Sequence, residues 1–206
     1  MSVVHVIDTI AEWAQANICD LVKLKQPPAD LDAPDDAGYE YTLVNPAVFP
    51  MYVPTKEKLP PSIHSPFPFL LVQFTSGQDN VASSSGFVDL QLSFSAWNPG
   101  IHGRDVFTNN GDGTHRQWSG EEAAAYYKRT GGGWRDAWNF TDVALRAIES
   151  VTNIGGYVID RETPVKFGPL TEQEAIPDFY PMWFAWLSFR VNYPLVRNIK
   201  EIQDFL

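Results

Sequence analysis

WRDAWNFTDVALRAIESV, residues 134–151, is the stretch that decides the fold. Apolar, small or tryptophan side chains recur in it at steps of three and four residues: Trp134, Ala137, Trp138, Thr141, Leu145, Ile148 and Val151. Arg135, Asp142 and Arg146 fall between these positions. This period predicts an amphipathic helix with one wide apolar face. Such a face must be covered by other elements, so we expect the helix to be the central packing element of the domain.

Strand-like runs lie on both sides of this helix in the sequence. Residues 69–75 form a nearly continuous apolar run and residues 87–97 alternate apolar with polar side chains, so together they predict an antiparallel hairpin. Residues 182–193, MWFAWLSFRVNY, predict a strand at the centre of a sheet. Residues 156–160 and 163–168 predict two short strands. The fold class that follows is α+β, with an antiparallel or mixed sheet of about four to six strands flanked by two main helices.

The length and the order of these elements predict a single domain over residues 1–206. Its expected parts are an N-terminal helix (1–24), a Pro-rich arm (25–68), the hairpin (69–97), a loop insertion (98–133), the central helix (134–151), the later strands (156–193) and a C-terminal tail (194–206). We expect the first helix to run from Val3 to Leu24, with its apolar face against the body. Short strands are expected at 39–43 and 49–53, and a loop at 77–86 between the hairpin strands.

The composition indicates a folded protein with little affinity for nucleic acid. Hydrophobic residues make up 44% and aromatic residues 14% of the chain, and the formal net charge is −10. Nucleic-acid binding needs clustered Lys and Arg, so the excess of acidic residues argues against sequence-specific binding. It is compatible with DNA passing through a channel with an acidic wall, because such a wall repels phosphate. Cys19 is the only cysteine, so no internal disulfide forms. Neither a signal peptide nor a membrane-spanning apolar run is visible, so we expect cytoplasmic synthesis and no membrane contact.

No motif predicts a catalytic, cofactor-binding or metal-binding site. Residues 110–113, NGDG, lack the closing Glu of a calcium loop and favour a turn. His102 and His115 do not have the spacing of a known metal site. Glu162 with an acidic residue of 172–178 leaves a glycosidase pair open, although carboxylates in such loops are usually solvated. We therefore expect a protein that is not an enzyme and that holds no cofactor or metal.

Two short signatures give a sharper indication of function. Residues 133–136, GWRD, open the central helix, and residues 174–184, EAIPDFYPMWF, open the last strand. Together they resemble a group of small tailed-bacteriophage proteins encoded in the head-to-tail joining region. In that group a Gly-Trp-Arg-Asp helix start is followed by a strand start similar to Pro-Tyr-Pro-Tyr-Trp-Phe, where this chain has Phe179 and Met182 in place of the first Pro and the second Tyr. The expected architecture is also similar to the phage tail terminator, or tail completion, proteins.

The resemblance implies a structural virion protein of the tail or neck, made in the cytoplasm of the bacterial host. It implies a hexameric ring of copies that caps the tail tube protein, offers a surface to the head connector protein and lets DNA pass. Trp134, Trp138, Trp183 and Trp186 are then expected to anchor the helix–sheet core, and Arg135 and Asp136 to pair within the subunit or across copies. Two alternatives stay open: another phage neck, tail or baseplate structural protein, and a monomeric carbohydrate- or ligand-binding module.

Overall fold

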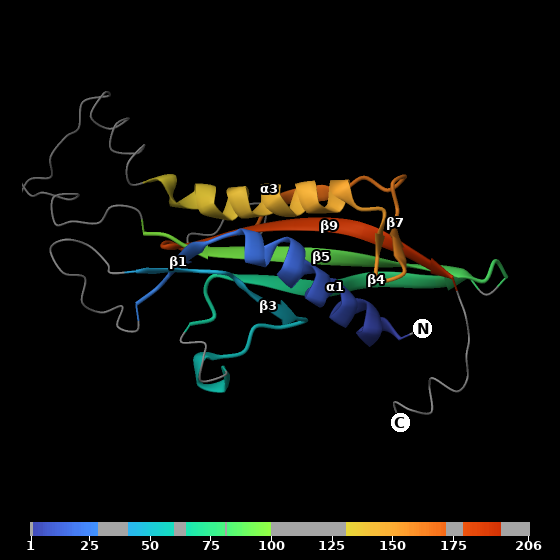
Figure 1. Ribbon diagram of the computed structural model, residues 1–206, viewed down its shortest axis with the longest axis horizontal. Helices are drawn as coiled ribbons and strands as arrows, with labels where there is room; N and C mark the ends of the chain where they lie inside the picture. Colours follow the sequence, from blue (N-terminus) through green and yellow to red (C-terminus); the bar gives the residue numbers. More distant parts are fainter. Residues whose placement is uncertain are drawn as a thin grey trace, which may run out of the picture.

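A computed structural model of the chain describes residues 2–28, 41–59, 65–80, 82–99, 131–171 and 179–194. Two α-helices, α1 (Val3–Asn17) and α3 (Trp134–Ser150), pack on a seven-stranded sheet (Figure 1). The strands of the sheet are β3 (Ala47–Pro50), β4 (Phe69–Asn80), β5 (Ser85–Trp97), β6 (Asn153–Ile154), β7 (Tyr157–Ile159), β8 (Lys166–Pro169) and β9 (Met182–Pro194). A two-stranded sheet, β1 (Leu24–Gln26) with β2 (Thr42–Val44), and short 3₁₀ turns complete it. The expected α+β class is confirmed.

The sheet is mixed and is built around its three long strands. β5 lies between β4 and β9 and is antiparallel to both, with Leu92 opposite Val72 on one side and Leu187 on the other. β3 adds to the outer edge of β4 in parallel. On the other side, β7 and β8 share the remaining edge of β9, and β6 pairs outside β7. β9 is therefore central, as its continuous apolar run predicts.

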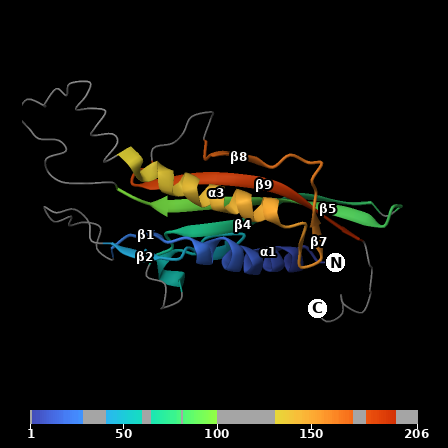
Figure 2. The same ribbon diagram turned by 45° about the horizontal axis from the view of Figure 1, so that its top comes forward.

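Both helices lie on the same face of the sheet. Figures 1 and 2 show α3 along β9 and β5, and α1 along β4 and β3. The core between helices and sheet holds Val6, Ile10, Leu90, Leu92, Phe94, Phe140, Ile148 and Leu187, all buried. The ring of Phe94 on β5 meets the ring of Phe140 on α3 edge to face, with centroids 5.0 Å apart. The alternation predicted for residues 87–97 is confirmed, because their apolar set lies on this face, where it meets Ala185, Leu187 and Phe189 of β9.

The opposite face of the sheet carries no helix among the described residues. At one end it holds an aromatic cluster in which Phe67 lies 5.3 Å from Phe69 and 6.2 Å from Phe184, ring centroid to ring centroid. Ser95 lies between the strands of Phe69 and Phe184 and is fully buried. Towards the other end the face becomes polar, with Asp89 and Arg190 as a cross-strand ion pair. We refer to this surface as the helix-free face.

The first helix is shorter than the sequence pattern predicts. α1 ends at Asn17, and a 3₁₀ turn (Cys19–Leu21) leads into β1, so the expectation of one helix to Leu24 is wrong. The Asn45 side-chain amide donates to the backbone carbonyls of Cys19 and Val22. These carbonyls lie beyond the end of α1, so the side chain supplies hydrogen-bond partners that the helix does not provide there. Leu21, which lies within the range of the expected helix, is 71% exposed.

The hairpin is longer than predicted, and its connection is correspondingly tighter. β4 runs on to Asn80 and β5 begins at Ser85, so most of the loop expected at 77–86 is strand. The Asn80 side chain accepts from the Ala82 and Ser83 amides and closes the turn. The Tyr193 hydroxyl donates to the Asp79 carboxylate, which ties the hairpin to the end of β9. Cross-strand pairing thus overrides the low strand propensity of a polar segment.

The remaining predicted elements are shifted or lie outside the described residues. The arm strands expected at 39–43 and 49–53 are β2 and β3, displaced by a few residues. β7 lies within the short strand expected at 156–160, and β8 overlaps the one expected at 163–168. β6 was not anticipated. The structure describes only the two ends of the insertion predicted at 98–133. The acidic loop at 172–178 and the C-terminal tail after residue 194 lie outside the described residues. No helix within the described ranges is long and apolar enough to cross a membrane.

Candidate functional site

The two sequence signatures meet in space at one residue, Asn98, which directly follows β5. The backbone N–H of Asn98 donates to the Pro181 carbonyl at 3.0 Å, and the backbone carbonyl of Asn98 accepts from the Trp183 indole N–H at 2.9 Å. The Asn98 side-chain amide nitrogen donates to an Asp136 carboxylate oxygen at 2.6 Å. Asp136 belongs to the GWRD segment and Pro181 and Trp183 to the other signature. Residues distant in the sequence therefore form one local unit, which we call the Asn98 junction.

The Asn98 carboxamide also connects opposite charges. Its oxygen accepts from the Lys25 ammonium at 3.0 Å, while its nitrogen donates to Asp136. Lys25 in turn lies 4.5 Å from the centroid of the Tyr41 ring. Hydrogen bonds to ionised groups are stronger than neutral ones, and Asn98 is almost fully buried, so the junction ties β1, β5, α3 and β9 together. A carboxamide suits this position because it donates and accepts at once.

The packing at the junction explains the glycine of the GWRD segment. A Cβ atom at Gly133 would lie 2.3 Å from the Asn98 carbonyl oxygen and 2.6 Å from the Trp183 indole nitrogen. No side chain fits there without displacing the backbone of Asn98. On the other side of the junction, the Tyr180 hydroxyl donates to the Pro99 carbonyl at 2.7 Å, and its ring packs edge to face on Trp183. Both ends of the predicted insertion thus lie at this junction.

The tryptophans of α3 lie at its surface. Trp134 is 44% exposed, and the Arg135 guanidinium lies 5.4 Å from the centroid of its ring. Among the described residues, Arg135 makes no ion pair. One turn further on, the half-buried Trp138 meets Phe167 of β8 edge to face, and Phe167 is 53% exposed. Trp134, Trp138 and Phe167 form what we call the aromatic stripe, along the flank of α3 next to β8.

The four tryptophans expected to anchor the core therefore have different roles. Trp183 packs partly against the core, but Trp134 is exposed, and Trp186 lies on the helix-free face with its indole N–H donating to the Pro169 carbonyl at 2.9 Å. The expectation that Trp134, Trp138 and Trp186 anchor the helix–sheet core is wrong. Trp97, whose indole was not expected to anchor the core, is the largest of several fully buried side chains among the residues that the structure describes. Whether these residues form interfaces stays a prediction.

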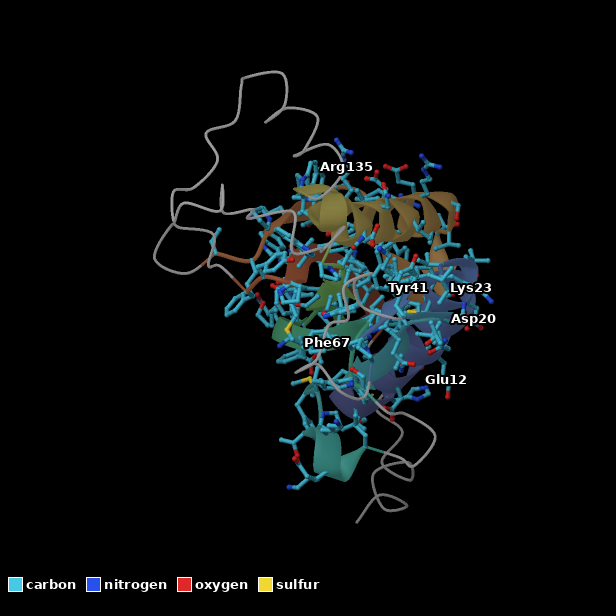
Figure 3. All side chains as sticks on the ribbon, turned by 90° about the vertical axis from the view of Figure 1, so that its left-hand side faces the viewer. Glu12, Asp20, Lys23, Tyr41, Phe67 and Arg135 are labelled. Atoms are coloured by element: carbon cyan, nitrogen blue, oxygen red, sulfur yellow. The ribbon has the colours of Figure 1, made fainter. Side chains whose placement is uncertain are left out.

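A second group of exposed apolar side chains lies on the α1 side of the molecule. Leu21 in the 3₁₀ turn, Tyr41 and Leu43 are 71%, 51% and 56% exposed. The hydrogen bonds from Asn45 hold the end of β2 against the turn that carries Leu21. Figure 3 shows Tyr41, Lys23 and Asp20 on the same side of the molecule, with Arg135 higher up on α3. We call Leu21, Tyr41 and Leu43 the α1-side patch.

The charged pair on the helix-free face is a structural one. Two guanidinium nitrogens of Arg190 bond the two Asp89 oxygens at 2.7 and 3.0 Å, and Arg190 also covers the Phe87 ring at 3.7 Å. The hydrogen bond from Arg190 holds the pKa of Asp89 below its usual range, with Ser76 adding a second bond. The same carboxylate raises the pKa of Arg190. With both oxygens of Asp89 accepting hydrogen bonds, the pair is suited to holding β5 and β9 together and not to proton transfer.

The described residues offer no obvious reactive group. Within these ranges no three His, Cys, Asp or Glu side chains are grouped to hold a metal ion. Burial raises the pKa of the Cys19 thiol, which disfavours the reactive thiolate. His102, His115, residues 110–113 and the acidic loop at 172–178 lie outside the described residues. The candidate site that remains is a set of surfaces around the Asn98 junction.

Comparison with known proteins adds no relative. No protein-family model matches this chain, and no curated protein matches it either. The features of the chain that bear on its function are therefore the two sequence signatures, the residues that surround Asn98 and the exposed aromatic side chains near it.

Proposed function

We propose that this chain is a structural subunit of a phage-type tail and acts as the tail terminator. In this role copies close into a hexameric ring that caps the tail tube protein and presents a surface to the head connector protein, in the virion. DNA passes through the ring without sequence-specific contacts. The subunit catalyses no reaction and needs no cofactor or metal.

The observation that carries the proposal is the Asn98 junction. The GWRD segment and the segment before β9 are the two parts of the sequence that resemble head-to-tail joining proteins, and both bond the same asparagine. A chance resemblance of two unrelated segments would not require them to share one structural unit. Their convergence supports treating the two signatures as one inherited feature.

The distribution of aromatic side chains supports an assembling subunit. The chain has seven tryptophans, and of the four on α3 and β9 none is fully buried. Aromatic residues are enriched in the cores of protein interfaces, because they bury a large apolar area with little loss of conformational freedom. Trp and Arg are among the residue types enriched at interaction hot spots, and here the exposed Trp134 lies beside Arg135, which makes no ion pair with another described residue.

The first test is native mass determination of the purified protein with negative-stain imaging of the same sample. The proposal predicts closed rings of one size, or rings that appear when purified tail tubes are added. Tubes with a cap at one end, seen only when the protein is present, would establish the role. A chain that stays monomeric at all concentrations and leaves tubes uncapped would refute it.

A monomeric carbohydrate- or ligand-binding module is the second candidate, and one feature favours it. The helix-free face places Phe184 and Trp186 beside the polar Gln91 and Ser93, the mixture of ring and hydrogen-bonding groups that binds sugars. This module predicts a monomer whose melting temperature rises with a glycan. A glycan-dependent shift in a monomer that ignores tail tubes would replace the terminator proposal.

A further inference from the structure

Residues 195–206, LVRNIKEIQDFL, follow β9 directly and lie outside the described residues. Leu195, Ile199, Ile202 and Leu206 recur at steps of four, three and four residues, which is the period of one apolar side of an α-helix. Pro194, the last residue of β9, suits the start of such a helix because it has no N–H to leave unbonded. A helix of this length spans about 18 Å and is marginal alone in water, so its apolar side needs a partner surface.

An exposed apolar surface lies beside the end of β9, at the first turn of α1. Val3 and Val4 are 42% and 61% exposed. The His5 ring next to them lies 6.1 Å from the Tyr157 ring, centroid to centroid, and Tyr157 belongs to β7, which pairs with β9 near its end. Figures 1 and 2 show the start of α1 and the end of β9 at the same end of the molecule. The chain therefore leaves the sheet next to Val3 and Val4.

The helix-free face is a poorer surface for an apolar helix at this end of the sheet. β5 and β9 place the ion-paired Asp89 and Arg190 there, followed by Asn192. Val158 on β7 is 46% exposed on that face, but its cross-strand neighbour is Asn192. Covering an ion pair and an amide with an apolar helix costs free energy that covering two valine side chains does not. This difference favours the α1 side.

We propose that residues 195–206 form a helix that packs against the first turn of α1 in the same copy, with Leu195 and Ile199 over Val3 and Val4. No linker separates this segment from β9, so its local concentration at α1 is far above that offered by a neighbouring copy. The docking does not depend on the terminator role, because it joins two parts of one subunit.

Trypsin cleavage of the full-length protein tests the docking, because the segment holds its own cleavage sites at Arg197 and Lys200. A synthetic peptide of residues 195–206 gives the rate for an undocked segment, and mass spectrometry of the C-terminal fragments gives the rate in the protein. These two bonds should be cut at least about tenfold more slowly in the protein, because a docked segment must open before it is cut. Cleavage of the wild-type protein at the rate of the peptide would overturn the proposal.

Substitutions identify the surface that the segment covers. Val4→Asp places a charge under the segment, yet α1 should tolerate it, because an acidic residue is favourable at a helix N-terminus. It should bring the cleavage rate to within about twofold of that of the peptide, because an uncompensated carboxylate would be buried by docking. Ile199→Asp, compared with a peptide that carries the same change, should do the same. Val158→Asp is the matched control on the opposite face and should leave the protection unchanged. Circular dichroism and thermal melting establish that each variant is folded.

Other outcomes locate the segment elsewhere. Protection that survives Val4→Asp, or that Val158→Asp removes instead, overturns the assignment of the surface. Protection that disappears at dilutions where the protein is monomeric shows that the segment docks on another copy, which also overturns the proposal. A wild-type protein that neither forms rings nor caps tubes overturns the terminator role but leaves this docking in place if the segment stays protected.

Discussion

Replacing Asn98 should weaken the whole end of the domain at which the signatures meet. Asn98→Ala removes the side-chain donor to Asp136 and the side-chain acceptor for Lys25, and keeps the bond from the Trp183 indole to the residue 98 backbone carbonyl. A hydrogen bond to a charged group contributes about 1.5–3 kcal/mol, and both bonds here are part-buried, so about 3 kcal/mol is expected for the two together. For a chain of this length 1 kcal/mol shifts the melting temperature by roughly 2–4 °C, so the midpoint should fall by about 6–12 °C.

Urea unfolding followed by circular dichroism measures this loss directly, with the midpoint lowered and the m-value unchanged. Asn17→Ala is the matched control, because its amide bonds the Trp13 carbonyl in an exposed position, and it should cost less than about 0.5 kcal/mol. A loss below about 1 kcal/mol for Asn98→Ala would refute the argument that this carboxamide holds the junction.

A charge exchange tests the chemistry of the same bond. Asn98→Asp sets two carboxylates against each other and should destabilise the protein at least as much as the alanine variant, despite the attraction to Lys25. Adding Asp136→Asn to this variant again places one carboxylate opposite one carboxamide, now with the carboxylate at residue 98. The double variant should therefore recover most of the lost unfolding free energy. No recovery would mean that the two side chains do not interact in solution.

Three further changes test other contacts. Arg161→Ala should cost about 1 kcal/mol by urea unfolding, because its guanidinium donates to the Ile148, Glu149 and Val151 carbonyls at the end of α3, whereas Arg146→Ala on the exposed side should cost nothing measurable. Ser95→Ala should stabilise by about 1 kcal/mol, because the buried Ser95 hydroxyl has no partner among the described residues; a destabilised variant would contradict this. Burial and the bond to Asp79 raise the pKa of Tyr193 to about 12 from 10.0. The contribution of Tyr193 to stability should therefore be full below pH 10 and should be lost between about pH 10 and 12, where the tyrosine ionises only in the unfolded chain. Tyr193→Phe should lose this part of the alkaline dependence of the unfolding free energy, and an unchanged pH profile would refute the prediction.

The long elements of the fold were predictable from the sequence, because each is decided by its own period. The alternation of 87–97 and the apolar run of 182–193 identify β5 and β9 without any tertiary information. The boundaries were not predictable where a distant group supplies the deciding bond. Asn45, more than twenty residues away, bonds the carbonyls beyond α1, and Tyr193 holds the hairpin from another strand.

The Asn98 junction could be predicted only in part. The GWRD segment and the segment before β9 were visible as signatures, but their common partner is a single asparagine in a region that looks like loop. An asparagine after a strong strand is ordinary, and nothing local distinguishes one that bonds Asp136 and Lys25. The useful signal was Gly133, since a glycine immediately before a helix leaves room for another backbone to approach.

The face of α3 that packs on the sheet shows why its tryptophans were misplaced. The residues that α3 buries most are Ala137, Phe140, Thr141, Ala144 and Ile148, mostly small ones. A helix that lies close to a sheet buries small side chains along its line of contact, and large rings fit only where the surfaces diverge, at the flank. Trp134 and Trp138 are therefore displaced from the core by geometry, and Trp138 meets Phe167 at the flank of the helix; that a partner surface covers these rings stays a prediction.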